Sequence, residues 1–359
     1  MFVNQLRRFV PMFWKRAATD HDLWFHARIH LLTRPMYSGI GSILALHRIC
    51  PQSGRKRLGS NRDLEITPQL LEDAIKFFKR KGYDFVSLDR VHEILKEGKA
   101  SNRFVAFTID DGYLDNYTYA YPIFREHDVP FTIYVATCFP DREAILWWYV
   151  LEDLLWGGDE LEVAFDNEVV KYDCSTVAKK EQVFDTASGH LTFAADQEEV
   201  KSILRADSSD YARYADDLAL HWEQIIELSK DRLVTIGSHT RRHLALSMLS
   251  ASDARAEVVE SKQRLEAHIG RRVEHFAYPH GGRKAAGLRE FQIVKECGFK
   301  TATTTRTGNI FKSHQDHLEC LPRIPVAVAE LEKNVGYLNL WVDGLVPCHE
   351  NSFSRVITV

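Results

Sequence analysis

Two neighbouring carboxylates end an apolar run of this chain and are followed at once by a glycine. The segment FTIDDGYLDNY, residues 107–117, passes from strand-forming residues to Asp110, Asp111 and Gly112. Two adjacent negative charges repel each other, so a cation or a shared proton must neutralise at least one of them. The structural alternative is a strand-to-helix turn, in which an aspartate caps a helix that starts near Tyr113.

A pair of histidines forms the second group that could do chemistry. In the segment GSHTRRHLAL, residues 237–246, His239 ends an apolar run and His243 follows four residues later. A helix or tight turn at this point would place both imidazoles on one side. Two histidines and one carboxylate bind a divalent metal and leave a coordination position open for water. The chain has 16 histidines, so the spacing alone is also compatible with ordinary surface or core residues.

The elements around these residues are predicted to be alternating strands and helices, because short β-branched and aromatic runs are separated by amphipathic, helix-length segments. One such helix follows Thr67 as N-cap and Pro68 in its first turn, and stops at Gly82. The expected strands are residues 42–48, 84–88, 104–110, 131–136, 233–239, 275–279, 299–304 and 320–326.

A closed or nearly closed barrel fits this alternation better than an open nucleotide-binding sheet, because no glycine-rich phosphate-binding motif is present. In such a barrel the carboxyl ends of all strands meet at one mouth, where active sites are built. The aspartates after 104–110 and the histidines after 233–239 are therefore expected to lie in the same mouth.

The predicted organisation has three parts and one interruption. A helical extension covers 1–38, the barrel covers 39–330, and a C-terminal extension covers 331–359. An insertion at 141–231 breaks the strand-helix rhythm and is expected to be mostly helical, with a β-hairpin that turns at Asp166 and Asn167. At its start, Trp147 and Trp148 either offer a stacking platform for a sugar or belong to the apolar stripe of a core helix.

Composition excludes several classes of function. The 359 residues are 45% hydrophobic and carry a formal charge of -4 with no basic stripe, so nucleic acid is not an expected partner. Six dispersed cysteines without a C-x-x-C pair indicate neither a disulfide framework nor a thiolate zinc site. No export signal or transmembrane run is seen, which predicts a cytoplasmic protein. The basic, aromatic N-terminus is expected to cap the domain, with peripheral membrane contact as the alternative.

Taken together, the segments TIDDG and SHTRRH resemble the two metal-binding motifs of the polysaccharide deacetylase (NodB-homology) family, also called carbohydrate esterase family four. The resemblance spans roughly 42–326 apart from the insertion. It implies a distorted α/β barrel of about seven strands. It also implies that Asp111, His239 and His243 are metal ligands and that Asp110 is the general base. Zinc is the first choice for this ligand set, with cobalt, nickel or manganese as alternatives.

Other family elements match less closely. FAYPHGG replaces the family's R-x-P-Y, so Ala277 stands where an arginine often braces the catalytic aspartate. Arg323, at another strand end, is the predicted substitute, unless it pairs with a different carboxylate. His280, with Tyr278 beside it, stands near the tyrosine whose main-chain N–H helps to hold the oxyanion. In LALHRI, His47 resembles the acid histidine of relatives with a rearranged barrel, and a buried structural histidine is the alternative.

The resemblance implies that the protein hydrolyses an N-acetyl group of an amino sugar in a polysaccharide, oligosaccharide or glycan precursor and releases acetate. Cytoplasmic precursors and lipid-linked sugars are the first substrates to consider. Arg241 and Arg242 either meet an anionic group of the substrate or form a solvated basic pair. Two other functions remain open, a metal-dependent hydrolase of a small non-sugar amide and a catalytically silent carbohydrate-binding relative. The departure at Ala277 favours the first, and the retention of Asp110 argues against the second.

Overall fold

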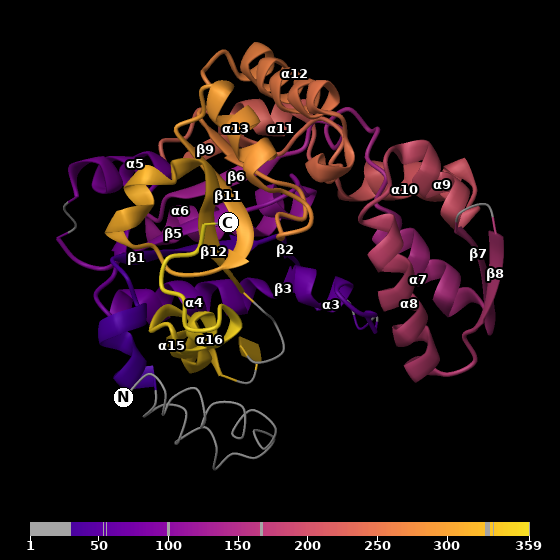
Figure 1. The fold of residues 1–359 in the computed structure, drawn as a ribbon, viewed down its shortest axis with the longest axis horizontal. Coiled ribbons are helices and arrows are strands. Elements are labelled where there is room, and N and C mark those ends of the chain that lie inside the picture. The colour runs from indigo at the N-terminus through magenta and orange to yellow at the C-terminus, as the bar shows by residue number, and fades with distance from the viewer. Residues whose placement is uncertain are drawn as a thin grey trace.

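The computed structural model describes residues 30–358 except 53, 55, 99–100, 166–167, 327–330 and 333. Figure 1 shows two lobes, a barrel that carries both described chain ends and a helical lobe made by the insertion. The predicted N-terminal extension lies outside the described residues up to residue 29, and residues 30–37 form a helix. Within the described part of the chain, no helix is long and apolar enough to cross a membrane.

The predicted barrel is confirmed: seven parallel strands form a closed ring. β1 closes it by pairing with β5 along six residue pairs on one side and with β12 on the other. A short eighth strand, β4 (Asp84–Phe85), pairs with the beginning of β5. The ring consists of β1 (Gly41–Leu46), β5 (Phe104–Ile109), β6 (Phe131–Val135), β9 (Val234–Ser238), β10 (His275–Ala277), β11 (Thr301–Thr307) and β12 (Leu321–Pro325).

Amphipathic helices cover the outside of the ring. The expected start of α4 is confirmed, because the Thr67 hydroxyl accepts from the Leu70 N–H and Pro68 is the first helical residue. Buried aromatic rings join helix and sheet, as in the stack of Phe124 on Phe131, whose centroids are 4.3 Å apart. Each such ring stabilises the fold by about 1.5–3 kcal/mol. The covering helices are α4 (Pro68–Arg80), α5 (Leu88–Glu97), α6 (Tyr121–His127), α12 (Ala251–Ile269) and α13 (Leu288–Glu296).

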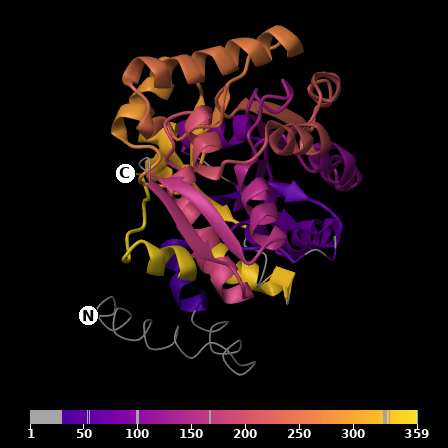
Figure 2. The same ribbon diagram turned by 90° about the vertical axis from the view of Figure 1, so that its right-hand side faces the viewer.

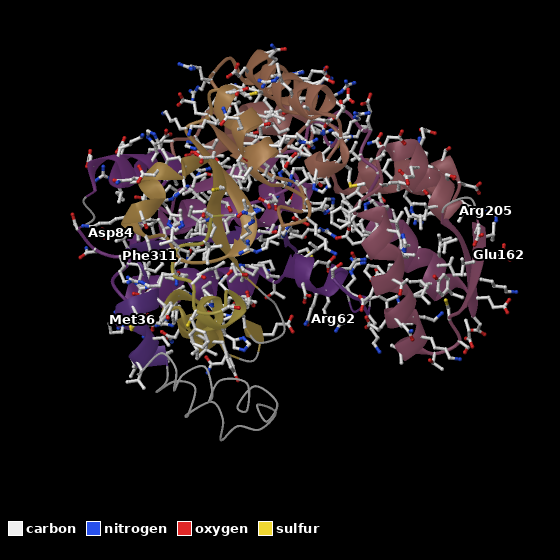
Figure 3. All side chains as sticks on the ribbon, in the orientation of Figure 1. Met36, Arg62, Asp84, Glu162, Arg205 and Phe311 are labelled. Carbon is white, nitrogen blue, oxygen red and sulfur yellow. The ribbon has the colours of Figure 1, made fainter. Side chains whose placement is uncertain are left out.

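The insertion forms the second lobe between β6 and β9 and has its own hydrophobic core. The hairpin is antiparallel and faces the viewer in Figure 2, while its predicted turn residues, Asp166 and Asn167, lie outside the described residues. At the outer end, Arg205 and Glu162 pair at 3.7 Å (Figure 3). The elements are α7 (Trp147–Gly157), β7 (Glu160–Phe165), β8 (Glu168–Asp173), α8 (Val177–Leu191), α9 (Gln197–Leu204), α10 (Ser208–Leu218) and α11 (Trp222–Leu228).

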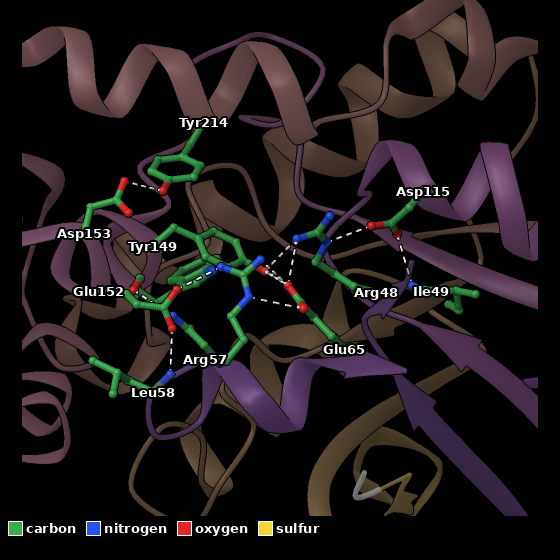
Figure 4. Close-up of polar contacts among 12 residues, drawn as sticks. Arg48, Ile49, Arg57, Leu58, Glu65, Asp115, Tyr149, Glu152, Asp153 and Tyr214 are labelled. Atoms are coloured by element: carbon green, nitrogen blue, oxygen red, sulfur yellow. Dashed lines mark hydrogen bonds and ion pairs between the residues drawn. The ribbon is translucent and has the colours of Figure 1, made fainter. Parts of the chain in front are cut away.

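A buried ionic network joins the insertion to the barrel (Figure 4). Arg48, in the short strand β2 (Arg48–Ile49), donates to Asp115 at 2.7 Å and to Glu65 at 3.0 Å. Glu65 also accepts from Arg57, whose other nitrogen reaches Glu152 of α7 at 2.8 Å. The short helix α3 (Asn61–Leu64) follows Arg57 and lies between the two lobes in Figure 1. The position of the insertion over the barrel is therefore fixed by charged groups.

The C-terminal residues return to the barrel through η5 (Val335–Tyr337), α15 (Leu338–Val342) and α16 (Leu345–Glu350). Asp343, next to α15, accepts from Arg103 at 2.9 Å and binds His30 at 2.8 Å, so both ends of the described chain share one buried anchor.

Candidate active site

A tight turn after β5 turns both aspartates toward the mouth of the barrel. The Gly112 N–H donates to the Asp110 carbonyl at 3.0 Å, and Gly112 has a φ of 97°, which glycine adopts without strain. Asp111 also has a positive φ of 76°. The carboxylates bind other side chains of the mouth, so they do not act as the helix cap that was the alternative for this segment.

Asp110 is held by Arg323 in a two-pronged ion pair. Nη1 and Nη2 of Arg323 donate to Oδ1 and Oδ2 at 2.6 and 2.7 Å, and neither residue is more than 1% exposed. Arg323 also donates to Thr108 Oγ1 at 3.1 Å. Burial alone would raise the pKa of Asp110, but the charge and hydrogen bonds of Arg323 outweigh it and hold the pKa below its ordinary value.

The structure places this brace where the sequence predicted one. Ala277 is fully buried and its methyl group packs in the interior of the barrel beside Tyr134. The guanidinium of Arg323 comes from β12 and lies 5.8 Å from the centroid of the Tyr134 ring. The positive charge that an arginine at position 277 would provide thus comes from Arg323 on a different strand.

Asp111, His239 and His243 converge as predicted. Asp111 Oδ1 lies 3.3 Å from His239 Nε2 and 3.1 Å from His243 Nε2. The three candidate ligand atoms lie within 4.8 Å of one another. Burial would raise the pKa of Asp111, but the charge of His243 and the hydrogen bonds from both histidines keep this pKa well below its ordinary value.

The donor set fits a divalent metal. Nδ1 of His239 lies 2.8 Å from the Ala277 carbonyl, which can only accept, so Nδ1 donates in this contact and Nε2 is left as the candidate ligand atom beside Asp111. Backbone strain accompanies the site, since Thr240 and His243 have φ values of 68° and 60°. Such conformations cost on the order of 1–3 kcal/mol each and are concentrated at functional sites. The chain therefore holds these side chains together at a cost in stability.

His47 lies at the edge of the same pocket. Its Nε2 is 3.8 Å from Asp110 Oδ2, and 27% of the side chain is exposed. Loss of solvation lowers the pKa of His47, and this outweighs the attraction of Asp111 and Asp110. The structure thus brings His47 within reach of the carboxylates.

The two oxyanion candidates have different positions. His280 has a φ of 59° and its ring centroid lies 5.0 Å from that of His243, in the pocket. Burial lowers the pKa of His280 to about 3, and His243 adds to this effect. Tyr278 is not brought to the site, because alternate residues of a strand face opposite sides. Its ring packs against Phe291 outside the barrel, and its hydroxyl donates to the Glu319 carbonyl at 2.8 Å.

The arginines between the two histidines are not free to meet an anion. Arg242 donates to Glu257 at 2.6 Å, and Arg241 donates to Glu260 at the same distance. Glu257 also accepts from the main-chain N–H groups of both arginines. Both side chains pair with glutamates of α12, Arg241 at an exposed position and Arg242 at a half-buried one, so neither is an unpaired cation within the described residues.

The pocket over these residues has a volume of about 210 Å³. Trp147 and Trp148 line it and are also part of the core of the insertion, so the core interpretation is confirmed and the stacking platform stays a prediction. The remaining wall of the pocket could not be predicted from sequence motifs. It comes from α3 and the residue before it, from α8 and the residue after it, and from β11. Its residues are Ser60, Leu64, Ser188, Thr192 and Thr305. The i, i+4 spacing of Ser188 and Thr192 was the one available signal, and it is common on exposed helices.

Comparison with known proteins gives one family match and several similar folds. The model of the family described as polysaccharide deacetylase matches residues 97–302. The deacetylase PplD of Streptococcus pyogenes, solved in complex with acetate, is 19% identical with a TM-score of 0.53, over 82% of this chain and 95% of that chain. IcaB from Ammonifex degensii is 16% identical with a TM-score of 0.52, over 85% of this chain and 97% of that one.

A de-N-acetylase from Aggregatibacter actinomycetemcomitans gives a TM-score of 0.52 at 14% identity, over 82% of this chain and 98% of that chain. At these identities the likeness shows a common fold. No curated protein matches the sequence. The family model, by contrast, covers more than half of the chain, including the aspartate pair and both histidines. The chain therefore belongs to the polysaccharide deacetylase family.

Proposed function

We propose that this protein is a metal-dependent hydrolase that removes N-acetyl groups from an amino sugar and releases acetate. The observation that carries the proposal is the convergence of Asp111, His239 and His243, with Asp110 next to them and braced by Arg323. Membership of the family supports a carbohydrate substrate. Since Arg323 replaces the brace that Ala277 lacks, the departure at Ala277 no longer favours a small non-sugar amide.

Asp111, His239 and His243 would hold the metal, with zinc as the first choice and cobalt, nickel or manganese as alternatives. A bound divalent metal acidifies water and polarises a carbonyl oxygen. The buried Arg323 keeps Asp110 ionised, so a carboxylate oxygen of Asp110 can accept the proton of an attacking water. These residues supply the nucleophile's base at a point where both aspartates are buried.

Two further groups complete the proposed reaction. The main-chain N–H of His280 donates to no acceptor within the described residues. It would donate to the negatively charged oxygen that develops from the acetyl carbonyl. His47 Nε2 donates a proton to the departing sugar nitrogen, which otherwise leaves poorly as an amide anion. The products are acetate and a free amino sugar.

The experiment is metal analysis of the purified protein followed by measurement of acetate released from N-acetylated oligosaccharides and from sugar-lipid precursors. Asp110→Asn is expected to bind metal as the wild type does and to release acetate about 10²–10⁴ times more slowly. Asp216→Asn, at an exposed position of α10, is the matched control and is expected to keep wild-type rates. Full turnover by Asp110→Asn would refute the assignment of the base. Turnover of simple amides without turnover of any sugar would refute the substrate class.

The cytoplasmic location and the peripheral membrane contact through the N-terminus stay predictions. Fractionation of cells that express the full chain tests both, because a soluble cytoplasmic enzyme remains in the supernatant after the membranes are removed. If the protein remains in the supernatant, we would test soluble precursors as substrates before lipid-linked sugars.

A further inference from the structure

The pocket above the candidate metal ligands has two unlike halves. The barrel supplies the charged half with its aspartates and histidines, as described above. The opposite half, which we name the roof, comes from α3 with the residue that precedes it, from α7, and from α8 with the residue that follows it. Its residues are Ser60, Leu64, Trp147, Trp148, Ser188 and Thr192. Among the described residues that form the roof, none carries a charge, so this half can contact apolar faces and neutral hydroxyl groups of a ligand.

The roof is firmly attached to its neighbours, although its parts come from distant segments. Glu181 of α8 accepts from the Gly59 N–H and from Arg62, both at 2.7 Å, which ties α8 to the start of α3. Asn61 of α3 donates to the Trp148 carbonyl of α7 at 2.9 Å. A Cβ atom on Gly59 would lie 2.4 Å from the Phe184 ring, so only glycine allows this approach. The pocket is thus roofed by packed elements rather than by a free loop.

Space in the pocket is limited on the side of Trp148. The pocket itself, at about 210 Å³, is smaller than the ~300–1,000 Å³ of sites that hold drug-sized ligands. On the far side of Trp148 and His243 lies a cavity of about 20 Å³, bounded by Gln197 and Arg242, which is too small for a further sugar unit. A glycan that enters the pocket therefore cannot continue past this side.

One polar group of the roof lacks a partner. Ser188 Oγ is buried, and no described residue of the chain forms a hydrogen bond with it. A buried hydroxyl without a partner costs on the order of 1–3 kcal/mol, which a ligand hydroxyl at this position would recover. Thr192 follows one helical turn later and lines the same pocket.

We propose that the pocket binds one neutral N-acetylated sugar unit, standing alone or at the end of a chain, and that Ser188 and Thr192 contact its hydroxyl groups. This inference rests on the proposed deacetylase function and narrows its substrate. An interior unit of a polymer has a neighbour on both sides and needs a groove that is open at two ends. Because the side at Trp148 has no room for a neighbouring unit, we expect the rest of the chain to leave the pocket on the side away from Trp148.

The first experiment maps the position of the free amine by mass spectrometry after the metal-loaded protein has acted on an N-acetylated homo-oligosaccharide. We expect the amine at a terminal unit, with interior units reacting at least tenfold more slowly. Equal rates at interior and terminal units would overturn this inference and leave the proposed function standing. Acetate release from no sugar at all would instead defeat the proposed function. A matched sugar that carries a carboxylate is expected to react more slowly than the neutral one, and equal rates would overturn the requirement for neutrality.

The second experiment replaces Ser188. Ser188→Ala is expected to raise KM for the oligosaccharide roughly fivefold, with kcat and metal content unchanged. Ser188→Trp is expected to abolish turnover by filling the pocket, with metal affinity unchanged. The control is Thr186→Ala on the same helix, because Thr186 donates to the Gln182 carbonyl and does not line the pocket. Wild-type KM and kcat in both Ser188 variants would overturn the assignment of the roof.

Discussion

Arg323 and Asp110 form a two-pronged ion pair, at 2.6 and 2.7 Å, that is buried at the mouth of the barrel. The arginine lies in the middle of β12 and the aspartate follows β5, and these two strands flank β1 in the ring. Because the strands of a closed barrel converge at one mouth, an arginine from β12 can reach the Asp110 carboxylate. It takes the place of an arginine at position 277, where this chain has alanine. The ion pair fixes both the charge and the direction of the Asp110 carboxylate.

Arg323→Lys is predicted to keep a positive charge and to lose the two parallel hydrogen bonds, because an ammonium is a point donor. Asp110 is then less well stabilised as an anion, and its pKa rises. Since the base acts when ionised, the acidic limb of the pH–rate profile moves to higher pH, and kcat falls by roughly tenfold or more. Acetate release between pH 5 and 9 measures both effects.

Arg323→Met removes the charge and leaves Asp110 buried without a partner. We expect this variant to lose on the order of 3–5 kcal/mol of unfolding free energy, as measured by denaturant titration. If Arg323→Lys kept the wild-type pH profile, the ion pair would be a structural feature without a role in setting the base.

His243→Ala is predicted to weaken metal binding, because it removes one of the three proposed protein ligands and the bond that this imidazole would form with the metal. Equilibrium dialysis against zinc should show a loss of at least 100-fold, and chelator treatment of the wild type should stop acetate release until metal is restored. His190→Ala, at an exposed position of α8, is the control for nonspecific histidine binding. Unchanged zinc affinity in His243→Ala would remove the basis for a metal site.

His47→Gln tests the proposed acid. An acid acts when protonated, and lost solvation lowers the pKa of His47, so the active fraction of the wild type falls as pH rises. The wild-type profile is expected to decline on its alkaline side, and His47→Gln should lose this limb and about 10² in kcat. Retention of the alkaline limb in the variant would assign it to another group.

The convergence of the candidate metal ligands and the candidate base could be predicted from the sequence because each follows a strand that short apolar runs identify. Asp110 and His239 end such runs, and a parallel barrel brings strand ends together whatever their distance along the chain. Arg323 was predicted for the same reason. Tyr278 was misplaced because sequence proximity to His280 says nothing of the side toward which a strand residue points.

The roof could not be predicted, because its residues belong to no motif and are brought together by tertiary packing alone. Ser60 and Ser188 lie far apart in the sequence, and both line the pocket because α8 packs next to the start of α3. A hydroxyl on an amphipathic helix has the same pattern whether it faces solvent or a pocket. The insertion was predicted as a unit, whereas its contribution to the pocket depends on how it packs.

Arg57→Met is predicted to loosen the insertion. Arg57 donates to Glu152, whose side chain is fully buried, so the substitution removes a cationic partner from a buried carboxylate. The expected loss is about 3–5 kcal/mol of unfolding free energy, measured by denaturant titration. Arg62→Met, which breaks a pair whose arginine is 50% exposed, is the control and should cost about 0–1 kcal/mol. Similar losses in the two variants would contradict the view that the buried network, rather than the surface pair, fixes the insertion.

His314→Gln is predicted to flatten the dependence of stability on pH. His314 is fully buried in η3 (Lys312–Asp316), where it accepts from the Phe311 N–H at 2.9 Å and lies 3.2 Å from the Ile357 carbonyl. Burial lowers the pKa of His314 to about 4 from an ordinary value of 6.5. The folded protein therefore binds this proton less readily than the unfolded chain, so the stability contributed by the neutral ring is present above pH 6.5 and is lost as pH falls toward 4.

The expected loss between pH 7 and pH 5 is about 2 kcal/mol of unfolding free energy in the wild type from this residue. Denaturant titrations at both pH values measure it, and His314→Gln should show a correspondingly smaller difference. The same substitution at the exposed His190 should leave the difference as it is in the wild type. An unchanged difference in His314→Gln would mean that the unfolded chain, or another buried group, sets the acid sensitivity. A smaller one would identify the buried, neutral ring of His314, which contacts the Ile357 carbonyl, as a source of the acid sensitivity.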